Sequence, residues 1–246
     1  MTTKSHKISV HCFSDGFSVY NKNEVIISSE NDYSKLPLFI QELNSKHQSS
    51  ELNIVGMNFE SPSVFVPKDY FKKEVAASYI ENFCVRPKSY SVSHQLVDSQ
   101  PLLVNVFYSN KWFSEIKEKN GLKLTYKHYW SCILSYLLGT QQKFKKNQKI
   151  VLYFNENYFD IFHLEEKQLK GANRFDFENE NEIIYFLLCY LEAHKLKASN
   201  IDFIPFGKFD SYIPYYQKLS EFFRLKYFND LNQSKDNSHY PWKLFT

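Results

Sequence analysis

Glycine is scarce in this sequence, with only six among 246 residues. Walker-type phosphate loops and the dinucleotide fingerprint both need clustered glycines, because a backbone can approach a phosphate closely only where no side chain intervenes. Neither motif occurs here, and the Gly-x-Ser-x-Gly turn of the α/β-hydrolases is absent as well. The sequence therefore gives no support for these enzyme classes.

Cysteine is sparse too, and neither the cysteines nor the histidines have metal-binding spacing. The four cysteines, Cys12, Cys84, Cys132 and Cys189, form no CxxC pair and lie among apolar neighbours. The eight histidines form no HExxH or HxH pattern. We therefore expect no structural zinc site and no disulfide framework, and we predict four reduced, mostly buried thiols.

Long apolar runs and an excess of one charge are also missing. The longest apolar stretch, Ile183–Leu191, is far shorter than the ~20 residues that span a membrane, and no apolar signal region follows Met1. With 30 basic and 27 acidic residues the net charge is only +3, whereas nucleic-acid binders usually show a clear basic excess. We expect a soluble, cytoplasmic protein without a membrane span, for which nucleic acid is not the expected partner.

The chain does have enough apolar residues for real cores, 43% of its length, and a strong hairpin signal near its start. Residues Lys7–Tyr20 alternate between apolar and polar on both sides of Asp15-Gly16, a dipeptide typical of a tight type I′ turn. The predicted elements that follow are a strand, a helix, a buried strand and a helix: Glu24–Ser28, Ser34–Asn44, Leu52–Met57 and Pro67–Glu81.

The same order of elements returns in the second half of the chain. Lys149–Phe162 again has strand, polar turn and strand, and it matches Lys7–Tyr20 at a constant offset of 142 residues. The elements expected after it are a strand, a helix, a strand and a helix: Gln168–Ala172, Asn181–Lys195, Asn200–Gly207 and Ser211–Phe223. Asn179 or Asn181 is expected to cap the first of these helices. A βββαβα order that recurs at nearly fixed spacing indicates an internal duplication.

The predicted fold class is therefore α/β, with mixed α+β sheets, in two lobes that repeat one architecture. The N-terminal lobe is expected at residues 1–140 with an inserted segment at about 90–128, the linker at 141–149 and the C-terminal lobe at 150–246. The extra material between the repeats predicts two strands, a helix, a strand and a helix: Tyr90–Leu96, Leu102–Phe107, Asn110 to before Gly121, Leu122–Tyr126 and Tyr129–Leu138.

A duplicated βββαβα unit is the plan of the actin-like (ribonuclease H-like) fold, which actin, the sugar kinases and the heat-shock chaperones share. The chain resembles more closely an uncharacterised bacterial family whose members adopt this ATPase fold. Three segments carry the resemblance: Phe13–Asn21, Asn173–Leu188 and Ile204–Gly207. The resemblance spans nearly the whole chain, and its motifs are structural rather than chemical.

The resemblance implies a nucleotide cleft. In actin-like ATPases an Asp-x-Gly-Ser/Thr type of turn in each lobe binds phosphates through backbone N–H groups, and its aspartate reaches a metal through water. Here the first turn, Ser14–Phe17, keeps Asp15 and Gly16, whereas the second turn, Asn155–Tyr158, has no glycine. Gly207, at a strand end, matches the family's adenosine-side glycine. The candidate cofactor-binding residues are thus Asp15, Gly16 and Gly207, for at most weak binding of ATP with Mg²⁺, and no catalytic residue or metal ligand is assigned.

Other features leave alternatives open. Asp15, Glu156 and Asp160 are either the ligands of a divalent-metal site or ordinary turn carboxylates. The basic run Lys143–Lys149 is either an RNA contact or a solvated linker. The apolar tail Tyr240–Thr246 either docks back on the body or presents its side chains to a partner.

We therefore expect an interaction module with a protein partner rather than an enzyme. The two turns are predicted to face each other across the cleft of the fold. There Phe17 and Tyr158 would crowd the phosphate path and Glu156 would add negative charge. The alternative is an active ATPase or small-molecule kinase with atypical phosphate loops, and a binding scan with nucleotides separates the two.

Overall fold

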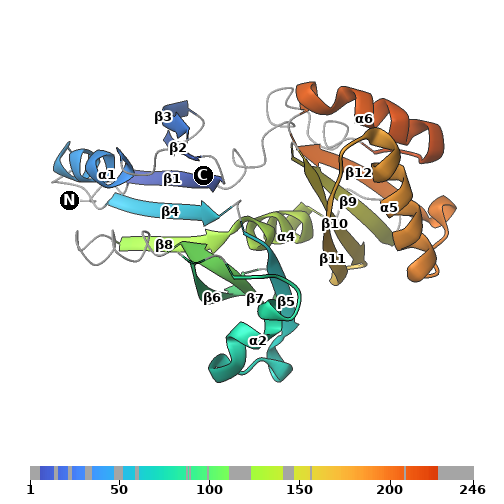
Figure 1. Cartoon of the computed structure of the whole chain (residues 1–246), viewed down its shortest axis with the longest axis horizontal. Coiled ribbons are helices and arrows are strands. Elements are labelled where there is room, and N and C mark those ends of the chain that lie inside the picture. Colours follow the sequence, from blue (N-terminus) through green and yellow to red (C-terminus); the bar gives the residue numbers. More distant parts are fainter. Residues whose placement is uncertain are drawn as a thin grey trace. The chain divides into compact units, whose positions relative to one another are not determined.

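The chain folds into two compact units, which divide between Ser135 and Tyr136. The computed structural model describes residues 6–13, 16–21, 24–30, 35–46, 52–58, 61–86, 88, 90–98, 100–110, 123–140, 147–155, 157–207 and 209–226 (Figure 1). Within these ranges no helix is long and apolar enough to span a membrane. Helix α4 (Tyr129–Thr140) crosses the division, and each unit otherwise has its own strands.

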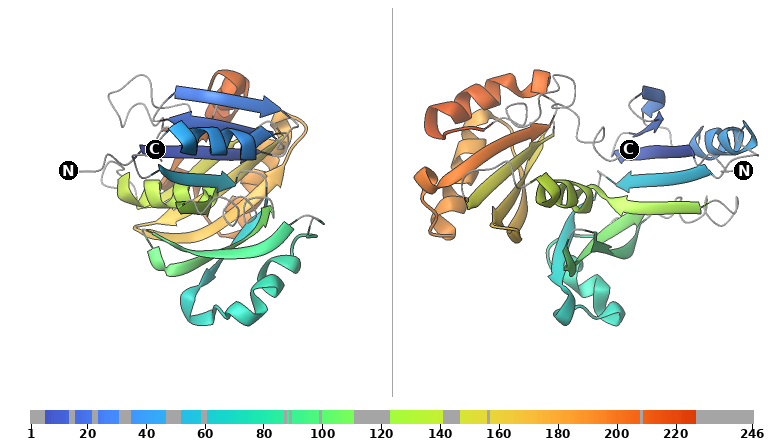
Figure 2. Two further views of the ribbon diagram at one scale, coloured as in Figure 1. Left: turned by 90° about the vertical axis from the view of Figure 1, so that its left-hand side faces the viewer. Right: turned by 180° about the vertical axis from the view of Figure 1, so that it is seen from behind.

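The first unit contains a five-stranded mixed sheet in the order β3-β2-β1-β4-β8. Its strands are β1 (His6–Phe13), β2 (Gly16–Asn21), β3 (Glu24–Glu30), β4 (Leu52–Asn58) and β8 (Lys123–His128). Strand β1 pairs antiparallel with β2 and parallel with β4, which in turn runs parallel to β8. Helix α1 (Lys35–Lys46) lies across one face of this sheet (Figure 2). The core between them consists of Ile8, Val10, Cys12, Phe17, Val19, Leu36, Ile40 and Leu43.

A second, three-stranded sheet is inserted between β4 and β8. It consists of β5 (Ser63–Pro67), β6 (Tyr90–Val97) and β7 (Gln100–Asn110) in the order β5-β7-β6. Two short 3₁₀ helices, η1 (Lys68–Tyr70) and η2 (Lys73–Val75), lead into α2 (Ala76–Glu81). Apolar side chains of α2 and the sheet form a small separate core: Val66, Ile80, Val104, Val106 and Tyr108.

The prediction of a helix from Pro67 to Glu81 is wrong over most of that range. Pro67 ends β5 and pairs with Leu103 of β7, so the α-helix begins only at Ala76. A proline is tolerated at the end of an edge strand, where its missing N–H costs no ladder hydrogen bond. The pairing partner of β5 lies about 40 residues away, a distance over which local patterns carry no information.

The second unit contains a four-stranded sheet in the order β11-β10-β9-β12. Its strands are β9 (Gln148–Phe154), β10 (Tyr158–Glu165), β11 (Gln168–Asp176) and β12 (Ile201–Gly207). Helices α5 (Glu180–Ala193) and α6 (Phe209–Phe222) lie on the same face of this sheet (Figure 1). After α6, Leu225 forms an isolated parallel bridge with Phe203, in the position relative to β12 that β8 occupies relative to β4.

The predicted duplication is confirmed at the level of topology and register. Strands β1, β2, β3 and β4 have the same order and directions as β9, β10, β11 and β12. In the first hairpin Val10 pairs with Val19, and in the second Leu152 pairs with Ile161, so the offset of 142 residues holds on both strands. The two hairpins are therefore equivalent parts of their sheets.

Helix α5 begins as expected and departs from expectation on one face. The side chain of Asn179 accepts hydrogen bonds from the backbone N–H groups of Asn181 and Glu182, so Asn179 is the N-cap. Leu188, expected on the apolar face, is 47% exposed, and Cys189 is exposed beside it. None of the four cysteines forms a disulfide. Cys12 and Cys132 are buried and Cys84 is half-buried, so the expected burial is wrong only for Cys189.

Several proposed boundaries lie near or outside the described ranges. Strand β9 begins at Gln148, inside the stretch 141–149 proposed as a linker. Strand β8, inside the proposed insertion at 90–128, belongs to the five-stranded sheet. The helix expected from Asn110 to Gly121 lies outside the described residues.

A testable consequence of the core packing concerns Gly171, which lies opposite His163 in the β10–β11 ladder. A Cβ atom at Gly171 would lie 2.5 Å from the hydroxyl oxygen of Tyr190, whose ring is 4% exposed. The ring is rigid and packed in the core, so we expect Gly171→Ala to lower the free energy of unfolding by about 1–3 kcal/mol in urea denaturation.

The matched control is Tyr190→Phe, which removes the offending oxygen. Among the described residues the buried Tyr190 hydroxyl has no hydrogen-bond partner, so this change alone should be nearly neutral or slightly stabilising. The next atom that the added Cβ would meet, Cζ of Tyr190, is at an ordinary 3.7 Å. The double variant should therefore recover most of the loss, and equal losses in the single and double variants would contradict this explanation.

Candidate functional site

The first turn of the resemblance lies between β1 and β2. Phe13 pairs with Gly16, and Ser14 and Asp15 between them lie outside the described residues. Gly16 is thus the first residue of β2. The sequence had suggested instead that Gly16 is a central residue of a type I′ turn. Its φ of 150° is one that side-chain-bearing residues rarely adopt, and this explains the glycine through backbone geometry.

Phe17 does not enter a phosphate path. It pairs with Cys12 in the β1–β2 ladder and is 2% exposed in the core beneath α1. Successive residues of a strand point to opposite faces of the sheet, and Phe17, directly after Gly16, is on the face that packs into this core. Phe159, at the equivalent position of the second hairpin, is also fully buried, against α5 and α6. The expectation that the Phe17 ring crowds a nucleotide is therefore wrong.

The second turn, between β9 and β10, is closed by its own hydrogen bonds. The backbone N–H of Asn155 donates to the carbonyl oxygen of Tyr158 (2.9 Å), and Nδ2 of Asn155 donates to the Tyr158 hydroxyl (2.7 Å). The backbone N–H of Phe177 donates to the carbonyl oxygen of Asn157 (3.0 Å). Tyr158 occupies the position equivalent to Gly16, so a large side chain stands where the first turn has none.

An ion pair lies beside this turn. Nε of Arg174 donates to Oδ1 of Asp160 at 3.0 Å, and these residues are cross-strand partners on β11 and β10. The Asp160 side chain is fully buried and that of Arg174 is 18% exposed. The guanidinium carbon of Arg174 also lies 3.8 Å from the centroid of the Tyr158 ring, which is a cation–π contact. Tyr158, Arg174 and Asp160 thus form one connected cluster.

This cluster bears on the candidate metal ligands. The Asp160 carboxylate binds a guanidinium, and Glu156 lies outside the described residues. In the described part of the chain no group of three or more histidine, cysteine, aspartate or glutamate side chains is placed to hold a metal ion. Sequence reasoning missed Arg174, although an opposite charge across from Asp160 in a predicted hairpin is a usable signal.

Of the three candidate cofactor-binding residues, the structure places Gly207 beside the second turn. Gly207 pairs with Phe154, so it lies at the same edge of the sheet as Asn155–Tyr158. This edge is formed by the carboxyl ends of the parallel strands β9 and β12, where open α/β sheets bind ligands. Gly16 lies in the other unit and Asp15 outside the described residues. The assignment of Asp15, Gly16 and Gly207 to a nucleotide stays a prediction.

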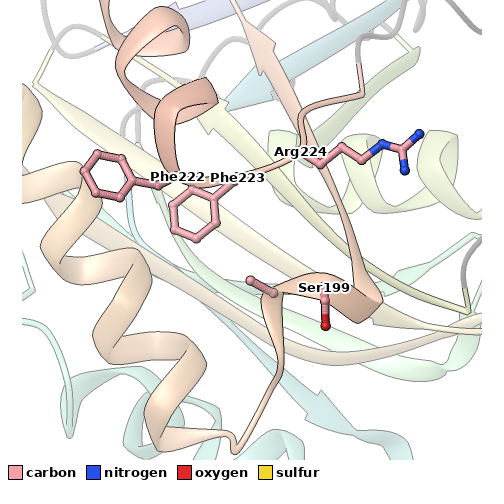
Figure 3. Close-up of a pocket in the computed structure, with 5 residues that line it drawn as sticks. Ser199, Phe222, Phe223 and Arg224 are labelled. Carbon is pink, nitrogen blue, oxygen red and sulfur yellow. The ribbon is translucent and has the colours of Figure 1, made fainter.

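A pocket of about 190 Å³ lies elsewhere, near the start of β12 (Figure 3). It is lined by Ala198, Ser199, Phe222, Phe223 and Arg224. In Figure 3 the Arg224 guanidinium points away from the two phenylalanine rings. Because the residues before Ile201 and the strand end at Gly207 are opposite ends of β12, this pocket is separate from the edge that carries the second turn.

The duplicated sheet order and register define a protein with the actin-like ATPase fold. A crystal structure from Bacteroides thetaiotaomicron, of a protein with this fold and unknown function, matches 94% of this chain and 93% of its own, with a TM-score of 0.73 and 17% identity. Weaker matches include the cytoplasmic domain of EpsL, an inner membrane component of the type II secretion system of Vibrio cholerae. It covers 81% of this chain and 80% of its own, with a TM-score of 0.40 and 8% identity.

The sequence also matches a family model, described as "Protein of unknown function (DUF3822)", over residues 13–225. The chain therefore belongs to this family. No curated protein sequence matches the chain significantly. At 17% identity the Bacteroides structure shows the fold alone, which agrees with the fold class predicted from the sequence.

Proposed function

We propose that this chain is a non-catalytic interaction module built on the actin-like fold, which acts in the cytoplasm by binding a protein partner. Any binding of ATP with Mg²⁺ is no tighter than about millimolar, which corresponds to roughly 4 kcal/mol of binding free energy. The actin-like fold alone does not imply ATP hydrolysis, because one fold hosts many functions and the residues of the site must supply the chemistry.

The observation that carries the proposal is the second turn. A phosphate-binding turn presents unoccupied backbone N–H groups and lets a phosphate approach them closely. Here the N–H of Asn155 is used within the turn, and the Tyr158 ring stands at the position of the first turn's glycine. The nearby cation, Arg174, is paired with Asp160. A triphosphate at this turn would therefore meet the Tyr158 side chain, and the positive charge of Arg174 would already be neutralised by Asp160.

The distribution of exposed apolar side chains supports a protein partner. Of ten large hydrophobic side chains exposed in the described part of the chain, six belong to the inserted sheet and its connections: Tyr70, Val75, Phe83, Val85, Leu96 and Leu102. Val85 is 94% exposed and Phe83 78%. A concentration of exposed apolar side chains in one region is typical of an interaction surface.

The test is isothermal calorimetry with ATP and Mg²⁺, together with an assay of phosphate release. We expect no hydrolysis above background and binding in the millimolar range or weaker. Micromolar, magnesium-dependent binding that Asp15→Ala abolishes would overturn the proposal and favour an ATPase or a small-molecule kinase. The matched control is Asp69→Ala, which removes an exposed aspartate from η1 and should leave any nucleotide binding unchanged.

A further inference from the structure

Two histidines and a tyrosine of the second unit come together at the end of helix α5. His163 alternates along β10 with Ile161, a core residue beneath α5, so its side chain lies on the face that packs against this helix. Tyr190 is in the last turn of α5, and His194 is its C-cap residue. Between ring centroids, His163 is 6.2 Å from Tyr190 and 6.2 Å from His194, and Tyr190 is 4.3 Å from His194.

The buried polar atoms at this place have no partner within the described part of the chain. They are Nδ1 and Nε2 of His163 and the hydroxyl of Tyr190. His163 is 5% exposed and Tyr190 4%. Gly171, which lies opposite His163 on β11, has no side chain that could supply a partner. Folded proteins satisfy nearly all buried polar groups, so three unpartnered atoms at one place indicate a ligand from outside the chain.

We propose that His163 and His194 bind one transition-metal ion of the Zn²⁺ and Cu²⁺ class, and that the Tyr190 hydroxyl donates a hydrogen bond to a water on that ion. Imidazole nitrogens suit these ions, whereas Mg²⁺ and Ca²⁺ prefer oxygen ligands. Burial lowers the pKa of His163, so near pH 7 its ring is neutral and keeps the lone pair that a metal needs. Burial also raises the pKa of Tyr190 to about 12, so the phenol keeps its proton and acts as a donor.

The spacing of the two imidazole rings fits a shared ion. Metal–nitrogen bonds of about 2 Å place an ion about 3 Å from each ring centroid, so two rings on one tetrahedral ion have centroids roughly 5 Å apart. The observed 6.2 Å needs only a small rotation of His194, whose side chain is exposed and can turn.

The electrostatic surroundings also admit a cation. His194 lies at the carboxyl end of α5, where the helix dipole favours positive charge. The other charged groups that act on His163 are Glu165 and Lys170, and they form a 3.3 Å salt bridge with one another. Their opposite charges largely cancel at His163. The ion would therefore join strand β10 to the end of α5 within the second unit.

The test is calorimetric titration of the full chain, treated first with a chelator, with Zn²⁺, Cu²⁺ and Mg²⁺ in turn. Only two ligands come from the protein, so we expect one equivalent of Zn²⁺ to bind with a dissociation constant of about 1–100 µM. Cu²⁺ should bind more tightly than Zn²⁺, and Mg²⁺ should not bind. His194→Gln changes an exposed residue, so the chain should still fold, and the variant should bind Zn²⁺ at least about tenfold more weakly. Electron paramagnetic resonance of the Cu²⁺ form should show two nitrogen ligands.

Two control variants separate this site from unspecific metal binding. His94→Gln removes an exposed histidine from β6 and should leave the affinity for Zn²⁺ unchanged. Tyr190→Phe removes a hydrogen bond but no ligand, so it should weaken binding by only about threefold. The proposal is overturned if the chain binds no Zn²⁺ up to roughly millimolar concentration. It is equally overturned if His194→Gln binds as tightly as the native chain, or if His94→Gln loses the binding. The titration contains no nucleotide, so each of these results leaves the proposed function standing.

Discussion

Arg174→Ala is expected to lower the free energy of unfolding by about 3 kcal/mol, among the largest effects of any single change in the second unit. Arg174 donates to a carboxylate, Asp160, whose side chain is fully buried. Removal of the guanidinium leaves that negative charge in the interior without the cation that offsets its desolvation. The Tyr158 ring loses its cation–π contact in the same change. Chemical denaturation followed by circular dichroism measures the loss.

Two further variants isolate the cause. Asp160→Asn in the Arg174→Ala background removes the buried charge, so it should recover part of the lost stability. Lys170→Ala removes another cation from β11. The Lys170 side chain is 40% exposed and forms a 3.3 Å salt bridge to Glu165, so this change should lower the free energy of unfolding by well under about 1 kcal/mol. A loss at Lys170 equal to that at Arg174 would show that burial of the pair is not what matters.

The acid sensitivity of the fold is expected to depend strongly on His11. This side chain is fully buried on β1, and burial lowers the pKa of His11 from 6.5 to about 3. The unfolded chain therefore takes up a proton at a higher pH than the folded chain does. The stabilising contribution is complete above pH 6.5 and is lost as the pH falls below it, by about 1.4 kcal/mol per pH unit until about pH 3.

The measurement is the free energy of unfolding from pH 8 to pH 4 for the native chain and for His11→Gln, which cannot take up this proton. We expect the acid limb of the variant to be shallower by about 1.4 kcal/mol per pH unit. Burial, reinforced by His194, also lowers the pKa of His163, so some acid sensitivity should remain. His94→Gln, at an exposed position of β6, is the control. Parallel acid limbs for the native chain and His11→Gln would rule out this role.

Much of the fold was predictable because its signals are local. The hairpin at Lys7–Tyr20, its repeat at Lys149–Phe162 and the capped helix after Asn179 all depend on alternation, periodicity and turn residues within a few positions. The constant offset of 142 residues then linked the two hairpins, and the register of both confirms it. The resemblance to an uncharacterised actin-like family is likewise confirmed by the family match.

The errors share a different physical origin. Pro67 was assigned to a helix because β5 is a strand only through its pairing with β7, and this pairing forms only in the tertiary fold. Phe17 was expected near a nucleotide, although the pleat of β2 directs it into the core. Cys189 and Leu188 were expected to be buried because their neighbours are apolar, but a helix in contact with one sheet face leaves its other side to solvent.

By itself, then, the sequence determined the class of the fold, its duplication and the absence of glycine from the second turn, since these follow from residue types and their spacing. Only the tertiary structure decided that Asp160 is held by Arg174, that Tyr158 closes its own turn and that β6 is an edge strand of its sheet. Each of those facts depends on which strands become neighbours. Strand neighbours are chosen by the packing of the whole sheet, because a pairing between distant segments is stabilised only once the shared core is buried.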